Sequence, residues 1–414
     1  MSVSIEDLPR EIFANILIST DGYTLGKCRR VCNGWKDFID QADYLWERMC
    51  MKDFKCSSQI ARKKSGNDCK WYYIYRNLKL WCDSIMHVKR LKEFYKFNVN
   101  TLEVSYGVLP VRDLVGTVLF DTTTLKIIPI TLPERNCVRI ANNDKVTVVL
   151  LSNSKILIQR TIESTSYTNE AVFNAENFAL SNDNVYYYMN NYIYKCNLKS
   201  RNLSSMLIAN CEYQIANIEH NNEITCIFTK CKKFLNILKD NTIVIKPVTC
   251  PKEWLPQLRN VYYFNEKNYI SYSRNLFILH TEKALHTYIN FPPIASLFFY
   301  GDIVLIGTRN SEIFLYKPFD KKKTKHTEIY QHMSLLVKLP DNKIPLKIDV
   351  CERKSGSLIL VMTSSDLFTI DINISYNDAG INTSKIYSKT QIDMYKRLLK
   401  IKERLDTATY MIHH

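Results

Sequence analysis

The sequence predicts a multidomain chain in which short α-helices come first and an all-β domain follows. Apolar residues recur at helical spacing over roughly the first hundred residues, and from about residue 101 short β-rich runs alternate with polar turns. The length of 414 residues and an apolar content of 46% suffice for two or three domains with cores of their own. A short amphipathic helix is predicted to close the chain.

Residues 1–54 are predicted to form a module of three to four short helices. Pro9 suits the first turn of a helix, and Leu8, Ile12 and Ile16 recur every four residues behind it. The helices that follow carry apolar residues at similar spacing, among them Leu25, Cys28, Val31, Cys32, Trp35, Phe38, Leu45, Trp46 and Met49. Helices this short bury little surface among themselves, so we expect their surplus apolar side chains to pack either on a partner or on the rest of the chain.

Residues 55–100 are predicted to form a basic, aromatic helical linker. Residues 51–100 hold twelve basic and four acidic side chains, so this short segment carries about half of the chain's net charge of +15. The stretch KWYYIYRNLKLW supplies Trp71, Tyr72, Tyr75 and Trp81. These aromatic residues fit a helical core. Alternatively, Trp71, Tyr72, Tyr73 and Tyr75 could stack on the bases of a nucleic acid while the basic residues neutralise phosphates.

Seven runs between residues 101 and 390 share one form, in which two apolar strands flank a polar turn. They span 114–130, 146–162, 185–198, 223–238, 268–281, 302–320 and 357–373. Each is predicted to be a β-hairpin. The turns recur about every 40 residues, the period of a four-stranded blade, so the pattern favours a β-propeller of about seven blades. Since the runs lack glycine pairs and a Trp-Asp dipeptide, the repeats are degenerate; a two-sheet sandwich is the alternative.

Two basic segments lie near the C-terminus. Before the last hairpin, Lys321, Lys322, Lys323 and Lys325 are predicted to lie in an exposed loop, where they are candidates for substrate contact. The alternative is a solvated loop with no partner. Residues 391–414 are predicted to form a basic amphipathic helix that packs on the β domain or binds an anionic partner, with its apolar face formed by Ile392, Tyr395, Leu398, Leu399 and Leu405.

No catalytic, cofactor or metal site is predicted. The ten glycines form no phosphate-binding loop, and no nucleophile or HExxH motif is present. Cys28 and Cys32 lack companion ligands at zinc spacing, so core packing is favoured. The thirteen cysteines show no regular pairing pattern, and no apolar stretch has the length of a signal peptide or membrane span. We therefore expect a cytoplasmic or nuclear protein.

The ordered landmarks of residues 5–50 resemble an F-box, whose pattern runs LP-x-E-hydrophobic, I-L, V-C-x-x-W and L-W. The β region resembles a WD-repeat propeller. The F-box resemblance implies that the chain binds a Skp-type adaptor and, through it, a cullin and a RING protein. The adaptor-binding framework that it implies comprises Leu8, Pro9, Ile12, Ile16, Leu17, Val31, Cys32, Trp35, Leu45 and Trp46.

This resemblance predicts a substrate-recognition subunit of a Skp-cullin-F-box ubiquitin ligase. The chain itself would perform no bond chemistry, and the β domain would present an unknown target protein. The positive charge suggests an acidic or phosphorylated target. A non-ligase scaffold, or a nucleic-acid-binding protein that uses residues 51–100, remains the alternative, and an enzyme housed in the β domain has no motif behind it.

Overall fold

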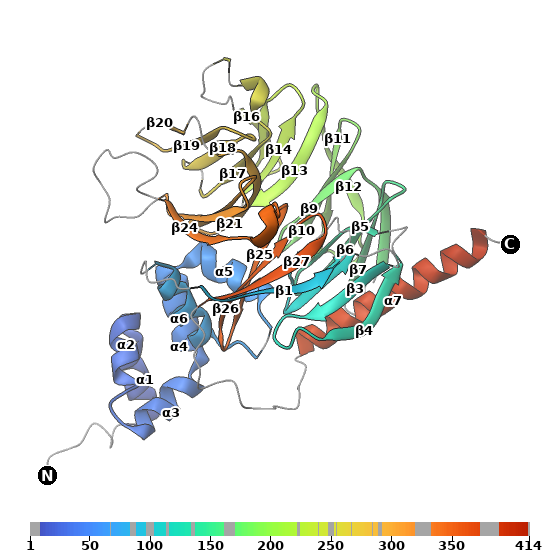
Figure 1. Ribbon diagram of the computed structural model, residues 1–414. Helices are drawn as coiled ribbons and strands as arrows, with labels where there is room; N and C mark the ends of the chain where they lie inside the picture. The colour runs from blue at the N-terminus through green and yellow to red at the C-terminus, as the bar shows by residue number, and fades with distance from the viewer. Residues whose placement is uncertain are drawn as a thin grey trace, which may run out of the picture.

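The computed structural model shows N-terminal helices attached to one side of a β domain, with a long C-terminal helix on another side (Figure 1). The structure describes residues 9–66, 68–82, 88–96, 103–112, 116–133, 137–160, 170–221, 224–238, 240–246, 252–253, 255–265, 267–283, 285–288, 292–318, 333–372 and 389–412.

Six short helices open the described chain. They are α1 (Arg10–Ile18), α2 (Gly22–Cys28), α3 (Asn33–Gln41), α4 (Asp43–Asp53), α5 (Lys55–Lys64) and α6 (Trp71–Cys82). Helix α1 begins directly after Pro9. Helix α2 is capped by Asp21, whose carboxylate accepts a hydrogen bond from the Thr24 N–H at 2.7 Å. Local capping and proline therefore determine where the first helices begin.

The β domain is a propeller of seven sheets, here called blades 1 to 7. Blade 1 contains β2 (Val108–Arg112), β3 (Gly116–Asp121) and β4 (Ile127–Pro133). Blade 2 contains β5 (Cys137–Asn142), β6 (Val146–Leu151), β7 (Lys155–Arg160) and β8 (Glu170–Asn174). Blade 3 contains β9 (Asn177–Leu180), β10 (Asn184–Met189), β11 (Tyr192–Asn197) and β12 (Ser205–Asn210). Blade 4 contains β13 (Ile215–Asn221), β14 (Ile224–Thr229), β15 (Phe234–Ile237) and β16 (Ile243–Lys246). Blade 5 contains β17 (Asn260–Tyr263), β18 (Tyr269–Tyr272), β19 (Phe277–His280) and β20 (Leu285–Tyr288). Blade 6 contains β21 (Ile294–Tyr300), β22 (Ile303–Thr308), β23 (Glu312–Tyr316) and β24 (Met333–Lys338). Blade 7 contains β25 (Lys347–Arg353), β26 (Gly356–Met362), β27 (Asp366–Ile372) and β1 (Val88–Lys96).

The predicted hairpins are all present. In blades 2 to 7 each is the middle pair of strands, and in blade 1 it pairs β3 with β4. Central strands such as β22 and β26 are buried along their whole length, which explains their unbroken apolar runs. The propeller prediction is therefore confirmed and the sandwich alternative is wrong. Hairpin turns adopt positive φ without glycine at Ser154, Asn190, Lys232 and Ser311, so the repeats need no glycine signature.

The last blade joins the two ends of the β domain. Strand β1, which follows the helices, pairs antiparallel with β27, so that Leu91 lies opposite Ile370. Residues 88–96 thus belong to the propeller and not to the helical linker predicted for 55–100. The error has a physical cause. An outer strand is solvated on one side and tolerates charges, so VKRLKEFYK lacks the apolar pattern of a central strand.

Helices α5 and α6 attach the N-terminal module to blades 6 and 7. Glu352 of β25 is fully buried and accepts hydrogen bonds from Trp81 Nε1 and Tyr300 OH, both at 3.0 Å, and from Ser357 Oγ at 2.6 Å. Burial raises the pKa of this carboxyl group. Asn77 Nδ2 donates to the Arg353 carbonyl at 3.0 Å. One apolar core runs from α1 through these helices into the two blades, so the module is fixed to the propeller.

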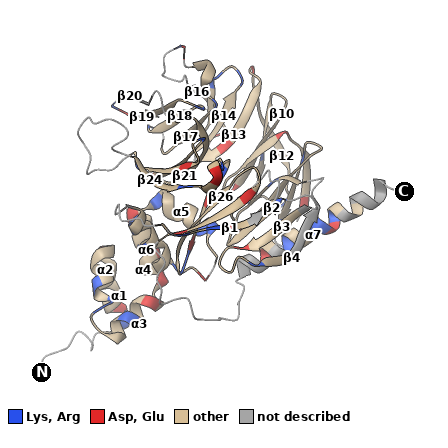
Figure 2. Cartoon of the chain, viewed as in Figure 1, with Lys and Arg blue, Asp and Glu red and all other residues tan. Residues whose placement is uncertain are grey.

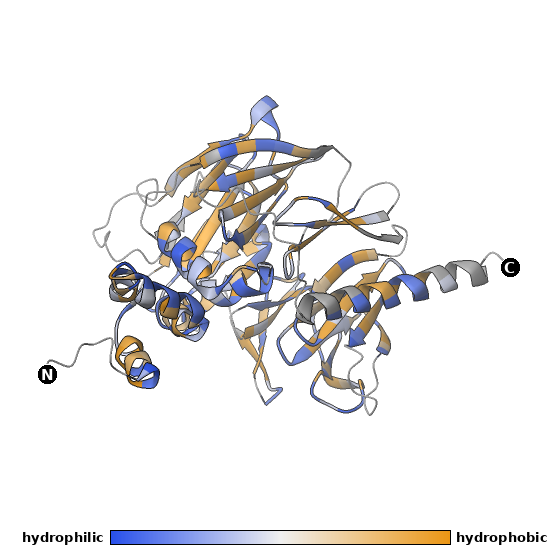
Figure 3. Cartoon of the chain, turned by 90° about the horizontal axis from the view of Figure 1, so that it is seen from below, coloured by the Kyte–Doolittle hydropathy of each residue, from blue (hydrophilic) through white to orange (hydrophobic). Residues whose placement is uncertain are grey.

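Helix α7 (Lys389–Ile412) packs against blades 1 and 2 (Figure 3). Its buried apolar positions are Met394, Leu398, Ile401 and Leu405, spaced four, three and four residues apart. Leu399, predicted on this face, is exposed. The side chains of Ile392 and Tyr395 lie outside the described residues. The helix thus packs on the propeller as predicted, although its apolar stripe lies differently around the helix.

His280 in blade 5 makes stability depend on pH. It stacks on Tyr269, its Nε2 lies 2.7 Å from Ser271 Oγ, and burial lowers its pKa to about 4. The unfolded histidine, with its pKa of 6.5, takes up a proton first as pH falls, so its stabilising effect is complete above that pKa and declines towards pH 4. We expect thermal and urea unfolding to show a loss of about 2 kcal/mol between about pH 7.5 and about pH 5. His280→Gln should remove that part of the slope; an unchanged slope would contradict the assignment.

Candidate partner-binding surfaces

The apolar residues predicted in the N-terminal module divide between its core and its surface. Leu17, Leu45 and Trp46 are almost fully buried, and Phe13 packs its ring 4.7 Å from that of half-buried Trp35. Cys32 caps α3 by accepting a hydrogen bond from the Trp35 N–H at 3.4 Å. These residues hold the helices together, a division that the sequence pattern alone left open.

The outer surface of the module carries large exposed apolar side chains. Ile12 and Ile16, one turn apart on α1, are 47% and 44% exposed, and Val31 between α2 and α3 is 64% exposed. Pro9 is exposed at the start of α1, and Leu8 lies outside the described residues. Tyr23, which the sequence analysis did not single out, is 66% exposed. Apolar groups exposed together on so small a module indicate a protein-binding surface.

Basic groups surround the exposed Val31. A shallow hollow there is lined by Arg29, Arg30, Val31 and Lys36. Asp40 forms a two-pronged ion pair with Arg29, with Nη2 to Oδ2 at 2.9 Å, and the pairing raises the pKa of the guanidinium. Arg30 and Lys36 are exposed, and Figure 2 shows both basic and acidic positions on the N-terminal helices. The surface around Val31 therefore combines an apolar group with positive charge.

The propeller offers a second surface at the end remote from α5. Strand β21 ends at Tyr300, whose carbonyl accepts a hydrogen bond from Ser57 of α5, and it begins at Ile294, whose N–H donates to the Arg274 carbonyl. The loops at this far end contribute basic residues from three neighbouring blades, namely Lys230, Arg259, Arg274 and Arg309. The predicted contacts Lys321, Lys322, Lys323 and Lys325 lie outside the described residues, between β23 and β24.

Hydrogen bonds between side chains link the inner strands of blades 2 to 5 into a belt. Arg139 Nη1 donates to Asn177 Oδ1 at 3.1 Å, and Asn177 Nδ2 donates to Asn217 Oδ1 at 3.1 Å. Asn217 and Asn260 both donate to Glu219 Oε1, at 2.8 and 2.6 Å, and burial raises the pKa of Glu219. The sequence analysis missed this belt. Its signal was an asparagine followed by an apolar residue at the start of three successive blades.

The described residues hold no cluster of three or more histidine, cysteine or carboxylate side chains that could bind a metal ion. Among the same residues, no helix has the length and apolar character needed to cross a membrane. The surfaces described above are those of a protein that binds other molecules.

Three comparisons with known proteins were informative to different degrees. A family model described as F-box-like matches residues 5–52. No curated protein matches the chain at a significant score. Similar solved structures include the WD40 repeats of RRP9, with 10% identity, 68% of this chain, 97% of that chain and a TM-score of 0.49. The Myceliophteria thermophila Cps50 (Swd1) β-propeller domain is 9% identical, and the match covers 70% of this chain and 100% of that chain with a TM-score of 0.47. The N-terminal domain of Nup159 is 10% identical, and the match covers 69% of this chain and 95% of that chain with a TM-score of 0.46.

An F-box-like module followed by a propeller defines a class of protein-interaction subunits that is typically non-catalytic. The propeller assignment rests on the chain's own strand order, with seven sheets and one blade closed by strands from both ends. The chain thus combines an N-terminal segment that matches the F-box-like family model with a seven-bladed β-propeller.

Proposed function

We propose that this protein is the substrate-recognition subunit of a Skp-cullin-F-box ubiquitin ligase. The observation that carries the proposal is the exposure of Ile12, Ile16 and Val31 on a module that matches the F-box-like family model. A Skp-type adaptor would cover these side chains and connect the chain to a cullin and a RING protein. Large apolar side chains that are about half exposed in the free chain contribute favourable binding free energy when a partner buries them.

The mechanism in this proposal is proximity. A target held on the propeller would have its lysines at a high local concentration near a ubiquitin-charged enzyme, and no group on this chain would react. The single apolar core shared by α1, α6 and blades 6 and 7 supports the proposal, because it fixes the distance between the adaptor-binding and target-binding ends. We place the complex in the cytoplasm or the nucleus.

The deciding experiment is reconstitution with purified components. The full chain should co-elute with a Skp-type adaptor and recruit a cullin–RING complex, and lysates supplied with ubiquitin should yield conjugates that depend on the chain. Failure of a well-folded chain to bind the adaptor would overturn the ligase proposal and leave a scaffold. Adaptor binding without recruitment of the cullin–RING complex would also overturn the ligase proposal.

The target surface follows from charge. We expect an acidic or phosphorylated target to bind the far end of the propeller, where Arg259, Arg274 and Arg309 lie. Replacing all three by Glu should weaken target capture about 30-fold or more, through lost pairing and new repulsion. The measurement is quantitative capture of lysate proteins by the wild-type and variant chains at two salt concentrations.

A matched reversal tests the other candidate surface. Lys321, Lys322, Lys323 and Lys325 can be replaced by Glu in the same assay, with unaltered adaptor binding as the folding control. If only the lysine variant loses the captured proteins, the target contacts lie in that segment and the far-end assignment is wrong. Equal capture by all three chains would remove charge as the basis of recognition.

The nucleic-acid alternative loses part of its support. Among the four aromatic residues proposed to stack on bases, Tyr75 is buried, and Trp71, Tyr72 and Tyr73 are partly buried in the apolar core. Arg62 Nη1 donates to the Cys69 carbonyl at 2.8 Å, and Lys64 Nζ lies 2.8 Å from Asp349 Oδ1. Arg62 thus joins α5 to the segment before α6, and Lys64 joins α5 to the propeller.

A further inference from the structure

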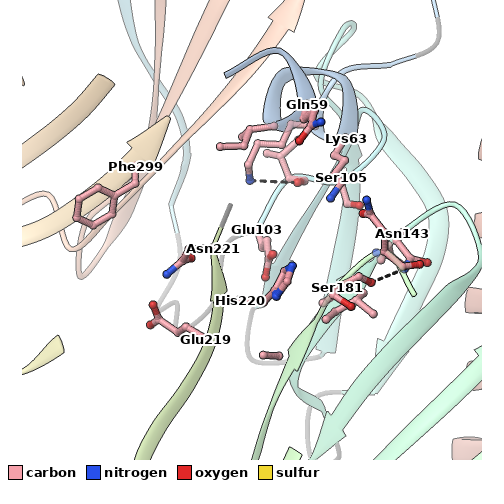
Figure 4. A pocket seen from close by; sticks show the side chains of 18 of the residues that line it. Gln59, Lys63, Glu103, Ser105, Asn143, Ser181, Glu219, His220, Asn221 and Phe299 are labelled. Carbon is pink, nitrogen blue, oxygen red and sulfur yellow. Dashed lines mark hydrogen bonds between the residues drawn. The ribbon is translucent and has the colours of Figure 1, made fainter. Parts of the chain in front are cut away.

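A cavity of about 400 Å³ lies where α5 covers one end of the inner strands (Figure 4). Helix α5 contributes Gln59 and Lys63 to its wall, and the segment before β2 contributes Glu103 and Ser105. The ends of β5, β9 and β13 and the turns after them supply Asn142, Asn143, Ser181, Asn182, His220 and Asn221. The cavity is thus a polar chamber between the helical module and the propeller, a place where ligand sites commonly form.

Lys63 and Glu103 line the cavity as two unlike charges that are not paired with each other. Among the described residues, neither the Lys63 ammonium nor the Glu103 carboxylate forms a hydrogen bond or an ion pair. Lys63 is exposed as a whole residue, and partial burial of its ammonium lowers its pKa. The neighbouring Lys64 differs, since Asp349 neutralises it at 2.8 Å.

A second pair of unlike charges also lines the cavity. Arg139 and Glu219 are both held in place by the asparagine belt, with Arg139 Nη1 fixed between Asn177 Oδ1 and the Phe178 carbonyl, the latter at 2.9 Å. Neither forms an ion pair among the described residues. These side chains are therefore oriented before any ligand arrives, which reduces the entropy lost on binding.

We propose that this cavity binds a small zwitterion of the size of a free amino acid or dipeptide. With Lys64 neutralised by Asp349, the cavity wall presents two positive and two negative groups. Glu103 and Glu219 would repel a purely anionic ligand, and Lys63 and Arg139 would repel a purely cationic one. Only a ligand that carries both signs is attracted by both kinds of charge, and the amide of Gln59 adds a neutral donor and acceptor.

The test uses the full chain and a panel of free α-amino acids and dipeptides, each followed by isothermal titration calorimetry. At least one member should bind with a dissociation constant of about 1 mM or tighter. Its N-acetyl derivative removes the positive charge, and its C-terminal amide removes the negative one. Each derivative should bind at least about tenfold more weakly. If no panel member binds, the cavity holds water only and the proposal is wrong.

Two substitutions place the binding in this cavity. Lys63→Gln and Glu103→Gln each remove one unpaired charge and should each weaken binding at least about tenfold. Lys400→Gln and Glu403→Gln on the exposed side of α7 are matched controls and should bind as the wild type does. Undiminished binding by both cavity variants would move the site elsewhere, and equal affinity for the N-acetyl derivative would make it an anion site. Either result overturns the proposal.

Discussion

Ile12→Asp together with Ile16→Asp should abolish binding of a Skp-type adaptor while leaving the chain folded. Both side chains point out from α1 and are about half exposed, so their replacement removes little from the protein's own core. In the proposed complex each would be buried, and an aspartate in its place would bury an unpaired charge. We expect a loss of about 4 kcal/mol, close to a thousandfold in affinity, measured by calorimetry with purified adaptor.

An exposed isoleucine elsewhere provides the matched control. Ile245 in β16 is 52% exposed and far along the chain from the F-box-like module. Ile245→Asp makes the same chemical change and should leave adaptor affinity within about twofold of wild type. If the α1 double variant binds as tightly as the Ile245 variant, the exposed α1 surface is not the adaptor-binding site.

The contrast between Ile12 and Leu17 shows how far sequence reasoning reaches in this module. Both belong to the same apolar pattern on α1, yet Leu17 is buried and Ile12 is about half exposed. Periodicity identifies the apolar stripe of a helix, but it cannot say how much of a broad stripe the other helices cover. That depends on how α1 packs against Trp35 and Phe38. The framework could be predicted; its division into core and surface required the structure.

The propeller was predictable because its signal repeats. Seven hairpins with one period indicate a closed array even when each repeat is degenerate. Strand β1 was not predictable in the same way, since its partner β27 lies about 280 residues further along the chain. The belt and the zwitterion cavity were missed for a related reason. Lys63, Glu103 and Arg139 have no local motif and line one cavity only once α5 and the blades have packed together.

Trp81→Ala should cause the largest loss of stability among single substitutions in the helical attachment. The indole is fully buried against blade 7, and its Nε1 donates to Glu352 and to Ser357, both at 3.0 Å. Truncation leaves a cavity and removes a donor from a buried carboxylate. We expect about 4 to 5 kcal/mol of destabilisation of α6 relative to the propeller, measured as lost hydrogen-exchange protection in α6 and the facing β25.

Two companion variants separate packing from hydrogen bonding. Trp81→Phe keeps most of the buried ring and loses only the N–H, so it should lose about 1 to 2 kcal/mol. Trp71→Ala removes a partly buried tryptophan from the same helix and should change the protection of β25 little. Equal loss in β25 for the two alanine variants would contradict a specific role for the Trp81–Glu352 contact.

The same variant links the fold to the proposed activity. If α6 fixes the adaptor-binding module to the propeller, Trp81→Ala should keep adaptor affinity, because α1 to α3 lie beyond the broken contact. It should nevertheless reduce ubiquitin conjugation of captured proteins about tenfold, since a loose attachment spreads the target's lysines over a larger volume. Unchanged conjugation alongside lost protection in α6 would show that the ligase tolerates a flexible joint, so that the rigid core serves stability alone.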